Sequence, residues 1–367
     1  MHEDRPSTAP DFLLSRATGS VRTQGARHTF NNADAAISAL RSKDVEMVVG
    51  AIPFDSDTPA ALTVPETIIR EEGPLEPHAY YRNQSLSSRV VGVDPEPEEH
   101  LRRVEAAIGT IETSKLEKVV LARAVDIEFP EAIDPRLVAA RLIDLSANRD
   151  GFIADLSPAG RPGAMLVGSS PEVLVKRQGS TVSAFPLAGS SPRRASAAED
   201  HLAGQDLLHS SKDLHEHAFV VDHLRRALTP LCERLDIPDV PQLISTNEMW
   251  HLGTPISGTL KDNDLTALEL ALAVHPTPAI CGTPAEAAQA LIETAETDRG
   301  FYAGAVGWCD SSGDGEFMVA IRCAEVAGDG LSARAWAGGG IVGDSDAQAE
   351  LEETTAKLRT ILKALSL

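Results

Sequence analysis

Hydrophobic positions recur every three or four residues in some stretches of the chain and every second residue in others, which predicts a mixture of helices and strands. The strand-like runs come in neighbouring pairs joined by short polar or Gly-rich turns, such as a Gln-Gly-Ser turn. Strands that alternate strictly with helices, as in doubly wound parallel sheets, are not indicated. We therefore expect an α+β fold with largely antiparallel sheets and helices packed outside. The predicted helices are 98–113, 135–148, nearly all of 196–235, 265–274, 284–296 and 346–365. The predicted strands are 118–129, 164–168, two within 172–185 that flank the Gln-Gly-Ser turn, and three within 302–339.

The Pro- and acid-rich stretch VGVDPEPEEH, which ends at residue 100, separates two differently patterned parts of the chain. We take residues 1–95 as an N-terminal subregion and residues 96–367 as the main part of the chain. A length of 367 residues is compatible with two domains or with one large enzyme domain, and the pattern leaves this choice open.

Composition and charge narrow the class of protein. The formal net charge of −21 opposes binding to nucleic acid or to an anionic membrane surface, because both need a basic surface. An anionic ligand would therefore need positive side chains placed locally. The four cysteines form no Cys-x-x-Cys pair, and no apolar run approaches the ~20 residues of a membrane span. We expect a soluble protein of the reducing cytoplasm.

The stretch SKDLHEHAFV places His215 and His217 on either side of Glu216. Zinc sites on helices use histidines four residues apart, whereas these two point to different sides of the helix. We expect ordinary polar helix residues that do not share one metal ion. Glu216 should lie beside Asp213, away from a core-facing stripe formed by Leu214, Ala218, Val221, Leu224 and Leu228.

The last predicted helix carries a second acidic group. Glu350, Glu353 and Lys357 share one face of it. Carboxylates from two helices would form a hard-oxygen site that selects Mg²⁺, which keeps several waters and completes its shell with an anionic substrate. From the helix alone, solvated surface charges are the simpler interpretation.

Gly338, Gly340 and Gly343 form a Gly-x-Gly-x-x-Gly pattern after a predicted strand. A dinucleotide site would need a further parallel strand with an acid ~20 residues on, and only one helix follows. We retain a weaker interpretation, in which these glycines allow a close approach of the backbone to a ligand and offer N–H groups to an anion.

Two further residues are ambiguous by themselves. Lys118 lies in an apolar strand on the same face as Val120 and Ala122, and lysines in strands more often face water at an edge. Glu172 follows a proline at the start of a predicted strand.

Eleven short motifs, in this order, resemble those of the chorismate-utilising enzymes, and most closely the isochorismate synthases of the siderophore branch. Each motif is weak alone, but the set in register is very specific. The motifs are VVGAIPFD, EKVVLAR, GSSPEVLV, FPLAGS, SKDLHEH, WHLGTPISG, HPTPAICG, VGWCD, GEFMVAIRCAEV, WAGGGIV and ELEETTAKL.

The resemblance implies a single enzyme domain over residues 1–367, with residues 96–367 as its catalytic core. Its fold would be α+β, with two stacked, largely antiparallel sheets, surrounding helices and a site in the cleft between them, as in anthranilate synthase component I. It also implies Mg²⁺ bound by Glu216 and Glu353, with Glu350 and Asp213 supporting through water and neither histidine acting as a ligand.

The resemblance further implies that water adds at C2 of chorismate while the C4 hydroxyl leaves, which gives isochorismate. Lys118 would be the base and Glu172 the acid, so the lysine must be neutral and the glutamate protonated at working pH. The substrate would be held by Gly189, Ala279, Tyr302, Arg322, Gly338, Gly339 and Lys357.

Ala279 stands where family members that expel pyruvate, such as salicylate synthase, tend to carry Thr, which favours isochorismate as the product. The next residue, Ile280, departs from the Leu usual in isochorismate synthases. Lys118 argues for water rather than ammonia as the nucleophile, so we expect no glutamine amidotransferase subunit. We also expect a monomer. Salicylate synthase and the menaquinone-branch isochorismate synthase remain alternatives within the family. A zinc hydrolase and a dinucleotide-binding module remain outside it.

Overall fold

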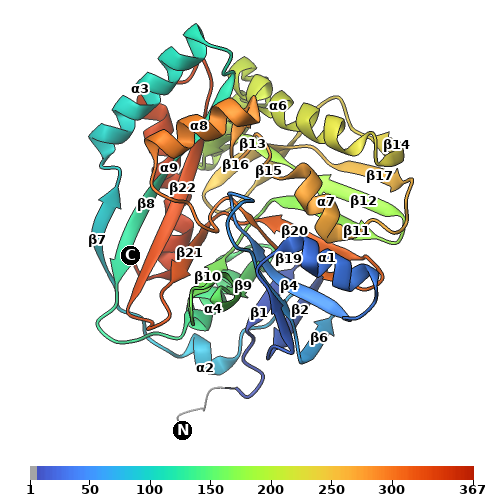
Figure 1. The fold of residues 1–367 in the computed structure, drawn as a ribbon. Helices are drawn as coiled ribbons and strands as arrows, with labels where there is room; N and C mark the ends of the chain where they lie inside the picture. Colours follow the sequence, from blue (N-terminus) through green and yellow to red (C-terminus); the bar gives the residue numbers. More distant parts are fainter. Residues whose placement is uncertain (1–5) are drawn as a thin grey trace.

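The computed structural model describes residues 6–367, in which two large antiparallel sheets and one small one form the framework (Figure 1). Sheet A has the order β18 (Gly282–Thr283), β8 (Lys118–Glu128), β22 (Ser332–Ile341), β21 (Cys323–Val326), β10 (Met165–Gly168), β9 (Gly151–Asp155), β1 (Phe12–Arg16), β2 (Gly19–Gln24) and β6 (Thr67–Glu71), and β7 (Arg89–Asp94) also pairs with β8. Sheet B has the order β14 (Cys232–Asp236), β17 (Ile256–Leu260), β12 (Thr181–Phe185), β11 (Val173–Gln178), β20 (Gly315–Val319), β19 (Ala305–Asp310), β4 (Met47–Ile52), β5 (Ala61–Val64) and β3 (His28–Phe30). Sheet C consists of β13 (Leu187–Pro192), β16 (Met249–Gly253) and β15 (Gln242–Ser245).

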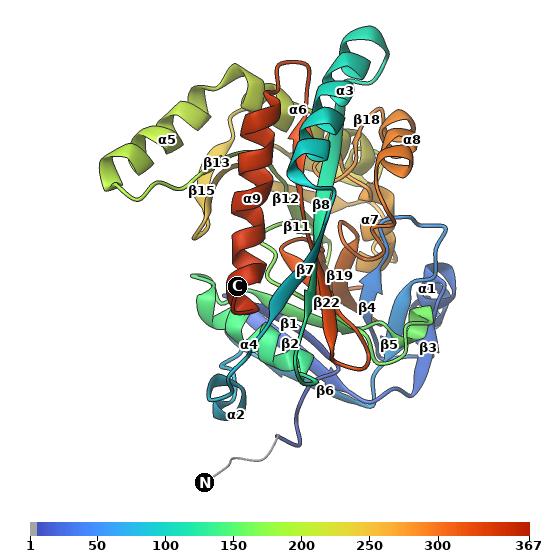
Figure 2. The ribbon, with the colours of Figure 1, turned by 90° about the vertical axis from the view of Figure 1, so that its left-hand side faces the viewer.

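Helices cover the outer faces of the sheets. They are α1 (Ala33–Arg41), α2 (Ala79–Arg82), α3 (Pro97–Thr113), α4 (Pro135–Leu145), α5 (Ala197–His209), α6 (Ser211–Leu228), α7 (Ala267–Val274), α8 (Ala285–Ala295) and α9 (Ala347–Ala364). Figure 2 shows α3, α4 and α9 side by side on one side of sheet A, with α5 projecting next to sheet C. None of the helices in residues 6–367 is long and apolar enough to cross a membrane.

The alternation of side chains along β1 shows how the layers are held together. Phe12 and Leu14 point into the core between the two large sheets, which also contains Phe317 of β20. Leu13 points the other way, into a second core that includes Ile143 of α4 and Ile361 of α9. The centre of sheet A is therefore buried on both faces, which explains why a strand such as β10 reads as a continuous apolar run.

The expected α+β architecture with antiparallel sheets is confirmed, and the predicted helices end within three residues of the observed ones, apart from the stretch 196–235. That stretch is not wholly helical. The helix ends before Pro230, which cannot continue it, and β14 follows as the edge of sheet B. Strands of the N-terminal subregion 1–95 join both large sheets.

The expectation of three strands within 302–339 was also wrong, since four are present. The apolar run GEFMVAIRCAEV contains two strands, β20 of sheet B and β21 of sheet A. The chain crosses between the sheets at Arg322, whose φ of 53° interrupts the extended backbone. Because the residues of β20 and β21 are nearly all buried, the hydrophobic pattern gives no sign of the crossing between these strands.

Candidate active site

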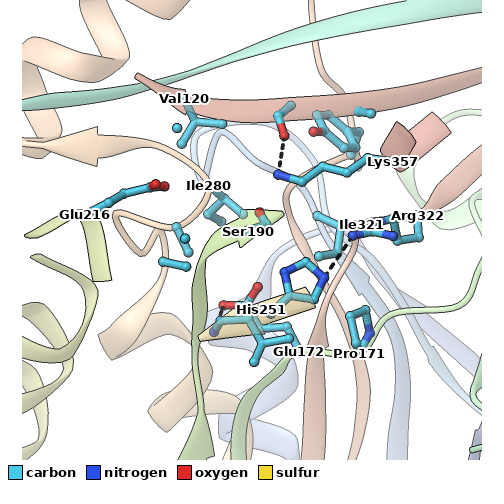
Figure 3. Close-up of a pocket in the computed structure, with 18 residues that line it drawn as sticks. Val120, Pro171, Glu172, Ser190, Glu216, His251, Ile280, Ile321, Arg322 and Lys357 are labelled. Carbon is cyan, nitrogen blue, oxygen red and sulfur yellow. Dashed lines mark hydrogen bonds between the residues drawn. The ribbon is translucent and has the colours of Figure 1, made fainter. Parts of the chain in front are cut away.

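A cavity opens where β8 and β22 of sheet A meet sheet C and helices α6 and α9 (Figure 3). Many separate segments of the chain contribute residues to this cavity, which is why the sequence motifs are scattered. Its lining residues are Val120, Pro171, Glu172, Leu187, Ala188, Gly189, Ser190, Glu216, His251, Ala279, Ile280, Tyr302, Ile321, Arg322, Ala337, Gly338, Gly340 and Lys357.

Lys118 is the first residue of β8, and its side chain is fully buried. Its Nζ lies 3.1 Å from Oε1 of Glu216 on α6. The interpretation of this lysine as an edge residue facing water is therefore wrong. A buried lysine in contact with one carboxylate is instead a candidate for chemistry.

Glu172 lies between β10 and β11, directly at the cavity, and is 3% exposed. Its Oε1 accepts a hydrogen bond of 3.3 Å from the backbone N–H of Leu187. Burial raises the pKa of this carboxyl to about 7, although the positive charges of Lys118, Lys357 and Arg322 lower it. Glu172 can therefore carry a proton near neutral pH and give it up within the cavity.

The acidic face of α9 is buried rather than solvated. The Oε1 of Glu350 lies 2.9 Å from Nζ of Lys212, and the Oε1 of Glu353 lies 2.6 Å from Nζ of Lys357. Burial and the neighbouring charge of Glu353 raise the pKa of Glu350 to about 7. The alternative of solvated surface charges is therefore wrong for this helix.

Asp213 and Glu216 bring the acidic face of α6 to the same place. Burial raises the pKa of Asp213, against the hydrogen bond from the Ser210 hydroxyl, and the charges of Glu216 and Glu353 raise it further. The carboxylates of the two helices are thus close enough to influence each other. Oε2 of Glu350 is buried without a hydrogen-bond partner, which leaves one oxygen of this cluster available.

His215 and His217 of α6 point to different sides of the helix, as expected. His215 is exposed and packs its ring 4.7 Å from that of Phe219. His217 is buried, with Nδ1 3.1 Å from the carbonyl of Ala188 and Nε2 2.7 Å from Oγ1 of Thr254. Since a carbonyl only accepts, Nδ1–H donates to it and Nε2 accepts from the threonine hydroxyl. Burial lowers the pKa of His217 to about 4, which fits this neutral, structural role.

The predicted core-facing stripe of α6 needs correction. Its exposed member is Ala218, and Leu214 is only half-buried, whereas Glu216 and His217 are buried with Val220. The first part of the buried face is thus polar, because it borders the cavity and sheet C, whereas Val220, Leu224 and Leu228 further along the helix pack into the apolar core.

Cationic side chains enter the cavity from two directions. Arg322 is buried, with Nη2 3.2 Å from Nε2 of His251 and Nη1 3.4 Å from Oγ1 of Thr360. Lys357 donates to the carbonyl of Gly338 at 2.9 Å, besides its contact with Glu353 (Figure 3). These groups provide the local positive charge that a ligand anion needs in a protein of net charge −21.

Glycines in β22 make room for side chains of the site. A Cβ at Gly338 would stand 2.8 Å from the hydroxyl of Tyr302, and one at Gly339 would stand 2.9 Å from Oε2 of Glu350. The sequence interpretation assigned these glycines to close approach of a ligand, and in this structure the neighbours that approach are protein groups. A Cβ at Gly189 of β13, whose φ is 75°, would likewise stand 3.0 Å from Cβ of Asp213.

The structure brings the predicted residues together, some in the wall of the cavity and the others directly behind that wall. Glu172, Gly189, Glu216, Ala279, Tyr302, Arg322, Gly338 and Lys357 line the cavity, and Lys118, Asp213, Gly339, Glu350 and Glu353 lie immediately behind it. Sequence reasoning missed His251, Ser190 and Lys212. All three lie at or near motifs that had been noted, but only their contacts with Arg322, Glu353 and Glu350 reveal them.

The fold and the site together define a chorismate-utilising enzyme. A family described as chorismate binding enzyme matches residues 40–366, and the chain belongs to it. A Mycobacterium tuberculosis protein named MenF is 45% identical over 367 residues, 97% of this chain and 96% of that protein. Isochorismate synthase DhbC of Bacillus subtilis is 44% identical over 323 residues, 87% of this chain and 80% of that protein. A crystal structure of DhbC from Bacillus anthracis has a TM-score of 0.90 and 37% identity, over 99% of this chain and 98% of that one. The resemblance inferred from the motifs is confirmed.

Proposed function

We propose that this enzyme converts chorismate into isochorismate. The observation that carries the proposal is Glu172, a buried carboxyl with a pKa raised to about 7 in a cavity that also holds two cationic side chains. Chorismate is a dicarboxylate that must lose a hydroxyl group, and such a site offers positive charge for the carboxylates and a proton for the leaving oxygen.

Glu172 and Lys118 divide the proton transfers. Glu172 gives its proton to the C4 oxygen, so that the C–O bond breaks and water leaves. Another water adds at C2 and passes a proton to Lys118. One water is consumed and one is formed, so the reaction is an isomerisation, and proton exchange with solvent resets both residues.

Lys118 can accept a proton only as a neutral amine. In this structure its Nζ contacts Glu216, an arrangement that suits the ammonium form. The working enzyme must therefore separate this pair or neutralise the carboxylate. This requirement ties the base to the acidic cluster behind the cavity.

The acidic cluster has the donor chemistry that Mg²⁺ prefers, although among residues 6–367 no three acidic or histidine side chains stand as a preformed metal site. Its donors are carboxylate oxygens, the ligand type that Mg²⁺ prefers, and Oε2 of Glu350 is buried without a partner. Glu216 and Glu353 would hold the ion directly, with Glu350 and Asp213 supporting through water. Bound Mg²⁺ would neutralise these carboxylates and bind a carboxylate of the substrate. His215 and His217 would take no part, which disfavours the zinc hydrolase.

Arg322 and Lys357 would anchor the substrate carboxylates, and Tyr302 and the backbone around Gly189, Gly338 and Gly339 would orient the ring. Ala279 lines the cavity without a hydroxyl, which supports isochorismate rather than salicylate and pyruvate as the product.

We further propose that residues 1–367 act as one cytoplasmic, monomeric enzyme domain without an amidotransferase subunit. The name DhbC among the relatives supports a role in making 2,3-dihydroxybenzoate for a siderophore. The name MenF supports the menaquinone branch as the alternative.

Incubation with chorismate and Mg²⁺, followed by chromatographic identification of the product, tests the function. Isochorismate as the sole product is expected, and a lactate dehydrogenase-coupled assay should detect no stoichiometric pyruvate. Salicylate with an equal amount of pyruvate would instead establish salicylate synthase. Chorismate left unchanged would refute both activities.

A further inference from the structure

A buried ion pair between Arg299 and Glu296 lies outside the residues assigned above. Glu296 follows α8, and Arg299 lies three residues further on, just before Tyr302. Nε of Arg299 lies 2.7 Å from Oε2 of Glu296, and Nη2 donates to Oε1 at 2.8 Å. The two side chains are 2% and 6% exposed, so this fork-to-fork pair is shielded from water.

The pair occupies a gap in the edge of β8. Along this edge, β18 pairs with residues Lys118 and Val119, and β7 pairs from Ala124 onward. Between them, the carbonyl of Val120 accepts a hydrogen bond of 2.7 Å from Nη2 of Arg299. The N–H of Ala122 donates to Oε1 of Glu296, also at 2.7 Å. Two side chains thus satisfy backbone groups that a neighbouring strand would otherwise pair.

The same guanidinium reaches a second wall of the cavity. Nη1 of Arg299 donates to the carbonyl of Ile280 at 2.7 Å, and Ile280 and Ala279 both line the cavity. Figure 3 shows Val120 and Ile280 near each other at this wall. One side chain therefore ties the strand that begins with Lys118 to the segment that carries Ala279.

A third contact concerns Tyr302. Its backbone N–H donates to the carbonyl of Arg299 at 3.0 Å, and the guanidinium lies 5.9 Å from the centre of its ring. On the other side, the guanidinium lies 4.6 Å from the ring centre of Phe54. These contacts leave Arg299 little freedom, and they connect its position to that of Tyr302, which lines the cavity.

We propose that Arg299 and Glu296 are positioning residues, which set the distance between the strand of Lys118 and the wall formed by Ala279, Ile280 and Tyr302. Neither residue of the pair lines the cavity. The pair fixes where the base and the opposite wall stand relative to each other, on which proton transfer depends. This inference rests on the proposed isochorismate synthase activity.

The test compares Arg299→Lys and Glu296→Gln with a matched control, Arg177→Lys. Arg177 is also buried, and it donates to the carbonyls of Ser312 and Asn263, neither of which lines the cavity. Lysine keeps the positive charge, but its single ammonium group cannot donate hydrogen bonds to Glu296, Val120 and Ile280 at the same time. We expect kcat for isochorismate formation to fall ~10–100-fold in Arg299→Lys, with KM changed less than ~3-fold, because misplacement of about 1 Å has such an effect. Glu296→Gln keeps an acceptor for the N–H of Ala122, so its kcat should fall less than that of Arg299→Lys. Arg177→Lys should keep the kcat of the unaltered enzyme.

Hydrogen–deuterium exchange makes the test independent of turnover. The amide of Ala122, which donates to Glu296, should exchange faster in Arg299→Lys and Glu296→Gln than in Arg177→Lys, and so should the amide of Val120, which donates to the carbonyl of Cys281 beside Ile280. If Arg299→Lys and Glu296→Gln both keep the kcat of the unaltered enzyme, or if exchange at these two amides is unchanged, the positioning role is wrong. If the unaltered protein forms no isochorismate, the proposed function fails, and the exchange measurement alone then decides whether the pair holds β8.

Discussion

Gly340 lies where any side chain would collide with Glu216. A Cβ at this position would stand 2.1 Å from Oε1 of Glu216 and 3.0 Å from Cε of Lys118. Strand β22 and helix α6 can approach this closely only because residue 340 lacks a side chain. The proposed base and a proposed Mg²⁺ ligand therefore share a space that glycine leaves open.

Gly340→Ala should move the Glu216 carboxylate and Lys118, because both are flexible side chains that can yield while the strand stays in place. We expect kcat to fall about 100-fold, as for other displacements of catalytic groups. The melting temperature should change little. Gly343→Ala is the control, since its Cβ would come no closer than 3.8 Å to another residue. Steady-state kinetics with chorismate checks this, and normal turnover in Gly340→Ala would contradict the assignment.

The role of Glu172 predicts how activity depends on pH. An acid must be protonated to act, and the pKa of this carboxyl is raised to about 7. We therefore expect kcat to fall as the pH rises through about 7. Glu172→Gln should lower kcat by ~10²–10⁴. The pH dependence of kcat in the unaltered enzyme and in Glu172→Gln tests this. If the residual activity of the variant falls with rising pH as in the unaltered enzyme, Glu172 is not the group that causes the fall.

The same shift predicts a change in stability. The folded protein holds the Glu172 proton up to a pH of about 7, whereas the unfolded chain releases it near the ordinary value of 4.5. The unfolded state is thus favoured progressively as the pH rises from about 4.5 to about 7, by up to roughly 3 kcal/mol for this group. Urea unfolding at pH 5 and pH 7.5 should show a smaller loss of stability in Glu172→Gln than in the unaltered protein. Equal losses would mean that Glu172 is not the group responsible.

Lys118→Gln removes the proposed base while keeping a polar side chain. We expect kcat to fall by ~10²–10⁴ with little change in substrate affinity, because Arg322 and Lys357 remain. The double variant with Glu172→Gln should be only slightly worse than either single one, since acid and base act in one step. Single-turnover kinetics would measure all three. Near-normal kcat in Lys118→Gln, or strictly multiplicative losses, would reopen the assignment.

The acidic cluster predicts dependence on Mg²⁺. Turnover should require Mg²⁺ and survive removal of zinc, and Glu216→Gln or Glu353→Gln should abolish it. Mg²⁺ should also raise the melting temperature of the unaltered protein, and less so in the two variants. His217→Ala loses the hydrogen bonds to Ala188 and Thr254, so it should be less stable yet keep the metal response while folded. Zinc-dependent activity without Mg²⁺ would overturn this cluster as the metal site.

The sequence predicted the positions of helices and strands better than the burial of their side chains. Helix α9 was placed within a residue at each end because its apolar positions repeat regularly over its whole length. The crossing at Arg322 was missed, because two consecutive buried strands read as one apolar run. The stripe predicted for α6 was only partly right, since periodicity marks which residues share a face but not whether a polar face is buried.

The candidate site shows the same division. The order and residue types of the eleven motifs pointed by themselves to the family and to the residues of the cavity. The pattern could not show that Lys118 is buried against Glu216, that Glu350 and Glu353 face inward, or that Arg299 and Glu296 complete the edge of β8. Hydrophobic periodicity and residue type are local properties that the sequence displays directly. Burial and pKa depend on segments more than a hundred residues apart, such as α6 and α9, and only the packing of the tertiary structure decides them.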